Sequence, residues 1–215
     1  MTRAHDLGGR PAGAIPEKDD AVIFHQEWHA KALALNLACG SLGTWNIDAS
    51  RFARERLSGY ASLSYYEKWM AGLTTLLVER GVVTEADLTG TPSKAPLSPK
   101  ALRAENVPAA MRTVTPYTRA TGPAPHFNIG DRVRTLPAPA PGHCRLPAYA
   151  AGKVGTIHMS HGNHVLPNTN ARFQGENPQP LYTVTFTAAE LWGPNAEAPD
   201  DQISLDLWQP YLEPL

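Results

Sequence analysis

Two histidines near the N-terminus have a spacing that could serve metal binding. His25 and His29 are four residues apart in a segment of predicted helix, so both side chains would lie on one face. Glu27 does not occupy the position that the zinc motif H-E-x-x-H requires, and no third ligand is evident in the sequence. We therefore favour surface or subunit-contact histidines over a metal site.

A second histidine set lies in the C-terminal half. His158, His161 and His164 follow one another at intervals of three, beside Gly162. A glycine-containing loop that leaves a strand often carries solvent-facing histidines, and no carboxylate is close in sequence to complete a ligand set. We expect a loop here and favour exposed histidines over metal ligands.

Other catalytic patterns are missing from the sequence. Cys39 and Cys144 are the two cysteines and form no C-x-x-C pair, so we expect free thiols, with neither a disulfide framework nor a thiolate metal site. Gly8, Gly9 and Gly13 precede no helix-opening strand, which favours turns over nucleotide binding. The sequence also lacks a G-x-S-x-G elbow. Spacing and composition alone therefore predict only a two-part globular protein.

The charge balance excludes some partners. Nineteen Lys and Arg residues against twenty Asp and Glu residues give a formal net charge of −1, so binding to nucleic acid or to an anionic membrane is disfavoured. The chain has no apolar run long enough to cross a membrane, and its first residues lack the apolar core of a signal peptide. We expect a cytoplasmic location.

The first half of the chain has helical periodicity. From Val22 to Cys39, apolar residues recur at intervals of three and four, and Gly40 supplies a stop. Asp48 is a candidate N-cap for a helix that runs through Leu57. Two further starts have the capping-box pattern, which places an acceptor three residues after the N-cap: Ser64 with Glu67, and Thr84 with Asp87.

The second half has strand character. Four segments combine strand composition with two-residue alternation: FNIGDRVRTL, GKVGTIHMS, LYTVTFTA and DQISLDLW. In the last segment, Ile203, Leu205 and Leu207 are expected to share a face. The fold class is thus α+β: an extended arm at residues 1–21, a helical domain at 22–90, a proline-rich linker at 91–125 and a small SH3-like antiparallel barrel at 126–215.

An ordered series of short motifs gives the chain a family resemblance. The sequence resembles the β subunits of nitrile hydratases, and the match runs nearly end to end. Each motif is weak alone, but together and in order they are specific. In this sequence they are HDLGG, FHQEW, YYEKW, FNIGDRVR, GHCRLPAY, GKVGTI, LYTVTFTAAELWG and DLWQPYLEPL.

The resemblance implies an enzyme that hydrates a small nitrile to its amide. In that family a non-corrin cobalt or a non-haem iron is bound by the α subunit, through a C-x-x-C-S-C loop that this chain lacks. We expect cobalt rather than iron, an α-subunit partner, an (αβ)2 heterotetramer and no metal ligand in this chain. The preferred nitrile and the attacking nucleophile are left open.

The resemblance also assigns site residues. Arg51 and Arg145 match two arginines that hydrogen-bond the oxidised cysteines of the α subunit, and a guanidinium suits that role because its donors form a fixed planar fork. Ile47, Tyr65 and Trp69 match residues that line the substrate pocket. From local sequence alone, Arg51 and Arg145 would be ordinary surface or loop arginines, and the aromatic residues would be core.

Two alternatives remain open. One is a component of thiocyanate hydrolase, a related enzyme in which the equivalent of this chain is divided between two polypeptides. Continuity across residues 90–125 argues against it. The other is a non-catalytic accessory or metallochaperone module, against which the expected barrel and Arg145 argue.

Overall fold

The chain forms two compact units. The computed structural model describes residues 3–10, 13–14, 22–90, 96 and 98–215. Met1–Pro11 and Pro116–Leu215 form one unit, here called the sheet unit, and Ala12–Thr115 form the other, here called the helical unit. The arm expected over residues 1–21, and the linker expected over 91–125, lie partly outside the described residues.

Short helices build the helical unit. Both α1 and α2 pack against α3, and the small side chains of Ala49 and Ala53 pack with Leu76 at the α2–α3 contact. None of the described helices is long and apolar enough to cross a membrane. The elements are α1 (Glu27–Gly40), α2 (Ile47–Glu55), α3 (Tyr65–Glu79), α4 (Glu85–Thr89), the 3-10 turn η1 (Ala104–Asn106) and α5 (Val107–Arg112).

Both predicted capping boxes are confirmed. The carboxylate of Glu67 accepts from the backbone N–H of Ser64 at 2.7 Å, and the helix α3 follows directly. The carboxylate of Asp87 accepts from the N–H of Thr84 at 2.8 Å at the start of α4. These starts could be predicted because each needs only two residues, three positions apart.

Two other predicted helix starts are wrong. The helix α1 begins at Glu27 rather than Val22. Asn46, not Asp48, caps α2: its side chain accepts from the N–H of Ala49 at 2.9 Å. Asp48 is instead the second residue of α2.

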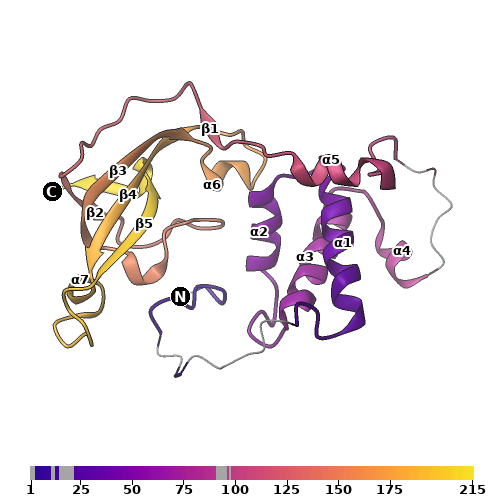
Figure 1. The fold of residues 1–215 in the computed structure, drawn as a ribbon, viewed down its shortest axis with the longest axis horizontal. Coiled ribbons are helices and arrows are strands. Elements are labelled where there is room, and N and C mark those ends of the chain that lie inside the picture. The colour runs from indigo at the N-terminus through magenta and orange to yellow at the C-terminus, as the bar shows by residue number, and fades with distance from the viewer. Residues whose placement is uncertain (1–2, 11–12, 15–21, 91–95, 97) are drawn as a thin grey trace. The chain divides into compact units, whose positions relative to one another are not determined.

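An antiparallel sheet forms the core of the other unit. Its strand order is β5-β4-β3-β2-β6, and β1 pairs with β3; Figure 1 shows β2, β3, β4 and β5 side by side. The strands are β1 (Thr118–Arg119), β2 (Arg132–Thr135), β3 (Val154–His164), β4 (Gln179–Thr187), β5 (Gln202–Trp208) and β6 (Leu212–Pro214). The short helices here are η2 (Ala148–Ala150), α6 (Pro167–Asn170), α7 (Ala188–Trp192) and η3 (Gln209–Tyr211).

The α+β class is confirmed, but a closed barrel is not. Within the described part of the chain, β5 and β6 end the strand order and do not pair with each other, so the sheet remains open. The expected inward face of β5 is confirmed, because Ile203, Leu205 and Leu207 are less exposed than the residues between them. Residues 161–164, expected as a loop, are strand: β3 continues to His164 by means of register shifts against β4.

Candidate functional site

Arg51 lies in the helical unit, on α2. Its Nη1 donates to Oδ1 of Asp48 at 3.3 Å, one turn earlier on the same helix. The Asp48 side chain is only 2% exposed, whereas that of Arg51 is 45% exposed. The carboxylate therefore anchors one nitrogen of a guanidinium whose side chain is partly exposed to solvent.

A cavity of about 350 Å³ opens beside α2 within the helical unit. Ile47 and Trp69, two of the three residues expected in the substrate pocket, line it together with Ser50 and Arg54. The third, Tyr65, is 63% exposed and is absent from the lining, but its ring lies 5.4 Å from that of Trp69. The rest of the lining is Asn36, Leu37, Gly40, Ser41, Trp45, Asn46 and Met111.

Arg54 is a lining residue that sequence reasoning missed. Its guanidinium carbon lies 4.8 Å from the centre of the Trp69 ring, a cation–π distance. It also donates to the backbone oxygen of Ser50 at 3.1 Å and to the Ser50 hydroxyl at 3.2 Å. Burial lowers the pKa of Arg54 below its usual value. The available signal was its spacing of three from Arg51, which puts both arginines on one helix face.

A glycine on α3 makes room for Arg54. A Cβ atom added at Gly72 would lie 2.5 Å from Cγ of Arg54, closer than two carbons can approach. The aliphatic part of the arginine therefore passes over Gly72 to reach the Trp69 ring. The cavity thus has an aromatic wall and a cationic edge, a combination that suits a small ligand with an electron-rich end.

Arg145 lies in the sheet unit, in an irregular segment between β2 and η2. Its neighbours His143, Cys144 and Leu146 are buried, at 0%, 5% and 0% exposed, whereas Arg145 itself is exposed. Among the described residues, none accepts a hydrogen bond from its guanidinium. Arg145 is therefore an exposed cation whose flanking residues, Cys144 and Leu146, are buried.

The backbone of Arg145 is held from inside the unit. Its N–H faces the hydroxyl of Tyr211 at 3.5 Å, and that hydroxyl donates to the side-chain oxygen of Asn168. Burial raises the pKa of Tyr211 well above its usual value, so the phenol stays protonated and keeps its proton for Asn168.

The histidines form no metal centre in the described part of the chain. The described residues contain no group of three His, Cys, Asp or Glu side chains placed to hold an ion. His25 is exposed, while His29 packs against the rings of Trp28 and Tyr66. His161 instead pairs across the sheet with the hydroxyl of Thr183 at 2.7 Å. Cys39 and Cys144 are both free thiols.

Comparisons with known proteins cover both units. The family description "Nitrile hydratase beta subunit, N-terminal" matches residues 1–113, and "Nitrile hydratase beta subunit, C-terminal" matches residues 116–214. This chain belongs to the nitrile hydratase β-subunit family. The resemblance stated from its motifs is thereby confirmed.

Individual relatives match over the full chain. The nitrile hydratase subunit beta of Pseudomonas putida is 33% identical, with all of both chains covered. The low-molecular weight cobalt-containing nitrile hydratase subunit beta of Rhodococcus rhodochrous is also 33% identical over all of both chains. Among solved structures, thiocyanate hydrolase from Thiobacillus thioparus, as the recombinant apo-enzyme, is 24% identical with a TM-score of 0.43, covering 53% of this chain and 98% of that one.

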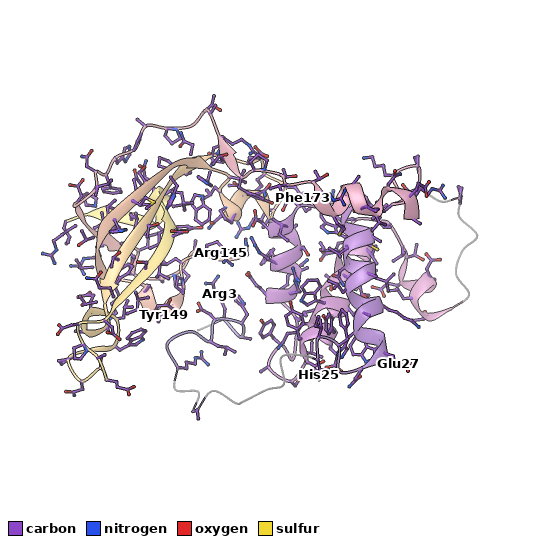
Figure 2. All side chains as sticks on the ribbon, in the orientation of Figure 1. Arg3, His25, Glu27, Arg145, Tyr149 and Phe173 are labelled. Atoms are coloured by element: carbon purple, nitrogen blue, oxygen red, sulfur yellow. The ribbon has the colours of Figure 1, made fainter. Side chains whose placement is uncertain are left out.

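Arg51 and Arg145 lie one in each unit. Each is exposed, and each is positioned by its own unit: Arg51 by a buried carboxylate, Arg145 by a buried backbone. Figure 2 shows Arg145 in the sheet unit, next to Arg3 of the N-terminal segment. Both side chains are exposed permanent cations that can donate hydrogen bonds to oxygen acceptors.

Proposed function

We propose that this chain is the β subunit of a nitrile hydratase, a hydro-lyase that converts a small nitrile to the corresponding amide together with an α subunit. Full-length matches to nitrile hydratase β subunits support the proposal. The alternative of a thiocyanate hydrolase component is not better supported, and no observation favours an accessory module.

The exposed guanidinium of Arg145 is the observation that carries the structural part of the proposal. An exposed arginine whose guanidinium has no acceptor among the described residues, and whose flanking residues are buried, is suited to an acceptor on another chain. We assign Arg145 and Arg51 to the oxygens of the α subunit's oxidised cysteines. Their planar donors would hold two oxygens in fixed positions, which a lysine ammonium cannot do.

The cavity of the helical unit is the proposed substrate pocket. In the proposal, Ile47 and Trp69 receive the organic group of the nitrile, with Tyr65 extending the aromatic wall. The cationic edge at Arg54 favours nitriles whose far end is electron-rich. This chain would then contribute orientation and electrostatics, and exclude water from the bound substrate.

The metal is assigned to the α subunit, as the family resemblance implies. Relatives named as cobalt-containing support cobalt as the ion. The described side chains of this chain do not assemble a ligand set, so no step at the metal is assigned to it. An (αβ)2 heterotetramer is the proposed assembly, which the mass of the purified complex in solution would test.

Co-expression tests the division of labour. The chain would be produced alone, and also together with an α subunit that carries a C-x-x-C-S-C loop, with that α subunit alone as the control. We expect cobalt by elemental analysis and amide formation by chromatography only for the complex. Nitrile hydration by this chain alone would contradict the proposal, and so would a loaded complex that forms no amide from any nitrile.

A further inference from the structure

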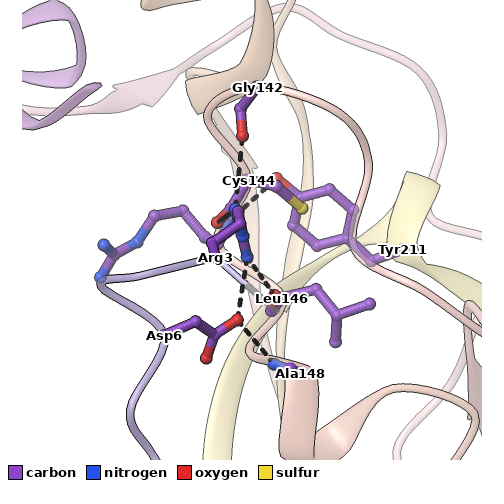
Figure 3. Close-up of polar contacts among 8 residues, drawn as sticks. Arg3, Asp6, Gly142, Cys144, Leu146, Ala148 and Tyr211 are labelled. Carbon is purple, nitrogen blue, oxygen red and sulfur yellow. Dashed lines mark hydrogen bonds and ion pairs between the residues drawn. The ribbon is translucent and has the colours of Figure 1, made fainter. Parts of the chain in front are cut away.

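The N-terminal segment is bonded to the segment that carries Arg145. Nη1 of Arg3 donates to the backbone oxygens of Gly142 and Cys144, each at 3.3 Å, and Nη2 donates to the oxygen of Leu146 at 3.2 Å (Figure 3). Two of these carbonyls belong to the residues directly before and after Arg145. One guanidinium therefore holds the backbone on both sides of the exposed arginine.

Asp6 extends these contacts to Ala148, two residues beyond Leu146. Its Oδ2 accepts from Nη2 of Arg3 at 3.2 Å and from the N–H of Ala148 at 3.0 Å (Figure 3). The side chains of Arg3 and Asp6 are 22% and 7% exposed, so their interaction is weakly screened by solvent. We call Arg3, Asp6 and their backbone partners in residues 142–148 the clasp.

A second contact fixes the segment independently of these charges. A Cβ atom on Gly8 would lie 2.7 Å from Cε1 of Tyr149, and one on Gly9 would lie 2.8 Å from Cβ of Tyr149. Gly9 also has a φ of +72°, which an L side chain rarely adopts. The two glycines thus let the chain lie directly on the Tyr149 ring, which stacks on Trp192.

Two motifs that are far apart in the sequence thereby meet. HDLGG at residues 5–9 contacts GHCRLPAY at residues 142–149, and Arg3 lies just ahead of the first motif. Irregular backbone needs partners for its carbonyl groups, and a guanidinium offers five N–H donors in one plane. Removal of Arg3 would leave three carbonyls without this donor and would free the segment around Arg145.

We propose that Arg3 and Asp6 are positioning residues for Arg145: the clasp fixes the backbone from which that side chain reaches the α subunit. The functional half of this inference rests on the proposed role of Arg145. The structural half states that the clasp orders residues 142–148, and it is independent of the role of Arg145. The two halves can therefore be tested separately.

Hydrogen exchange tests the structural half. Arg3→Ala would be compared with Arg10→Ala, which removes the same charge from an exposed position in the same segment. We expect the peptide covering residues 142–149 to exchange about 10-fold faster in Arg3→Ala, both in the full chain and in the αβ complex, and to be unchanged in Arg10→Ala. Unchanged exchange in Arg3→Ala would overturn the inference whatever Arg145 does.

Steady-state kinetics of the complex test the functional half. We expect Arg3→Ala to lower kcat about 10-fold with little change in KM, because a misplaced clamp alters the reacting geometry and not the substrate cavity. Arg3→Lys should recover part of the loss, since an ammonium can reach one or two of the carbonyls. We expect the visible absorption of the metal centre to shift in both Arg3→Ala and Arg145→Lys.

The outcomes separate the two proposals. If Arg3→Ala exchanges faster but keeps full kcat, while Arg145→Lys loses activity, the positioning role is wrong and the proposed function stands. If Arg145→Lys is silent as well, the role of Arg145 fails and the positioning role fails with it. Should Arg3→Ala prevent folding, Asp6→Asn provides the same test, because it weakens the ion pair but can still accept from Ala148.

Discussion

The two exposed arginines differ in how the protein holds them. Arg51 is held by its side chain: a buried carboxylate on the same helix binds one nitrogen of the guanidinium. Arg145 is held by its backbone: Arg3, Asp6 and Tyr211 bond the chain around it, while its guanidinium has no acceptor among the described residues. A local pair therefore positions the first, and contacts distant in the sequence position the second.

This difference predicts different sensitivities. A side chain that is already paired has little freedom, and a substitution that keeps the charge keeps the pair. A side chain that is positioned only through its backbone keeps its full reach, so its own chemistry decides what it binds. We therefore expect Arg145 to tolerate replacement by lysine less well than Arg51.

The largest effect is expected for Arg145→Lys in the αβ complex. Losing the planar fork should lower kcat by about 100-fold, the scale seen when one donor is removed from a preorganised oxyanion site. Metal content should not change, because the ligands are on the α subunit in the proposal. Arg132→Lys, at an exposed position on β2, is the matched control. Full activity in Arg145→Lys would contradict the clamp.

Arg51→Lys should lower kcat less, by about 10-fold. Lysine at this position can still pair with Asp48 one turn away, so the cation remains anchored while the bidentate geometry is lost. The measurement is kcat for both lysine variants in complexes of equal cobalt content. Equal losses would show that local pairing does not protect Arg51, and the distinction between the two arginines would be lost.

Asp48→Asn tests the anchor itself. We expect the free energy of unfolding to fall by about 1–2 kcal/mol, because the Arg51 guanidinium would then donate to a neutral amide oxygen in place of a buried carboxylate. The loss is limited because the freed Arg51 is half exposed and can be solvated. Urea unfolding of the full chain measures it, with Glu85→Gln at an exposed position of α4 as the control. A stability change no larger than that of the control would argue against the anchor.

Local signals predicted the parts of the fold that depend on neighbouring residues. The two capping boxes, the face of β5 and the α+β class are of this kind. The predicted N-cap of α2, Asp48, was wrong because Asn46 and Asp48 are both favourable N-cap residues. The choice depends on burial: Asp48 lies inside the unit, where it pairs with Arg51.

The clasp could not be predicted, because it joins residues that are far apart in the sequence. Arg3 is more than a hundred positions from the carbonyls that it bonds, and no local pattern marks it. The extension of β3 through Gly162 to His164 is also tertiary in origin, since β4 and β1 supply its partners. Arg51 and Arg145 were singled out only by family resemblance, and their roles remain proposals.

The smallest effect is expected for Tyr211→Phe, which removes the hydroxyl beneath Arg145. Near neutral pH the variant should be less stable by about 1 kcal/mol, the net value of a buried hydrogen bond. Burial raises the pKa of Tyr211 in the folded protein, so the stability of the natural chain should decline once the pH exceeds about 10, where the unfolded phenol ionises. Phenylalanine cannot ionise, so the difference between the two proteins should narrow above that pH.

Urea unfolding at pH 8 and at pH 10.5 would measure this narrowing, with Tyr65→Phe, whose hydroxyl is on an exposed residue, as the control for stability. The variant Tyr211→Phe also shows how much the Tyr211 hydroxyl contributes to positioning Arg145, compared with Arg3. The carbonyls on either side of Arg145 stay bonded to Arg3, so kcat should fall by no more than about 2-fold in the complex, well below the loss in Arg3→Ala. If kcat falls further in Tyr211→Phe than in Arg3→Ala, then Arg145 is positioned mainly by the Tyr211 hydroxyl and not by the N-terminal segment.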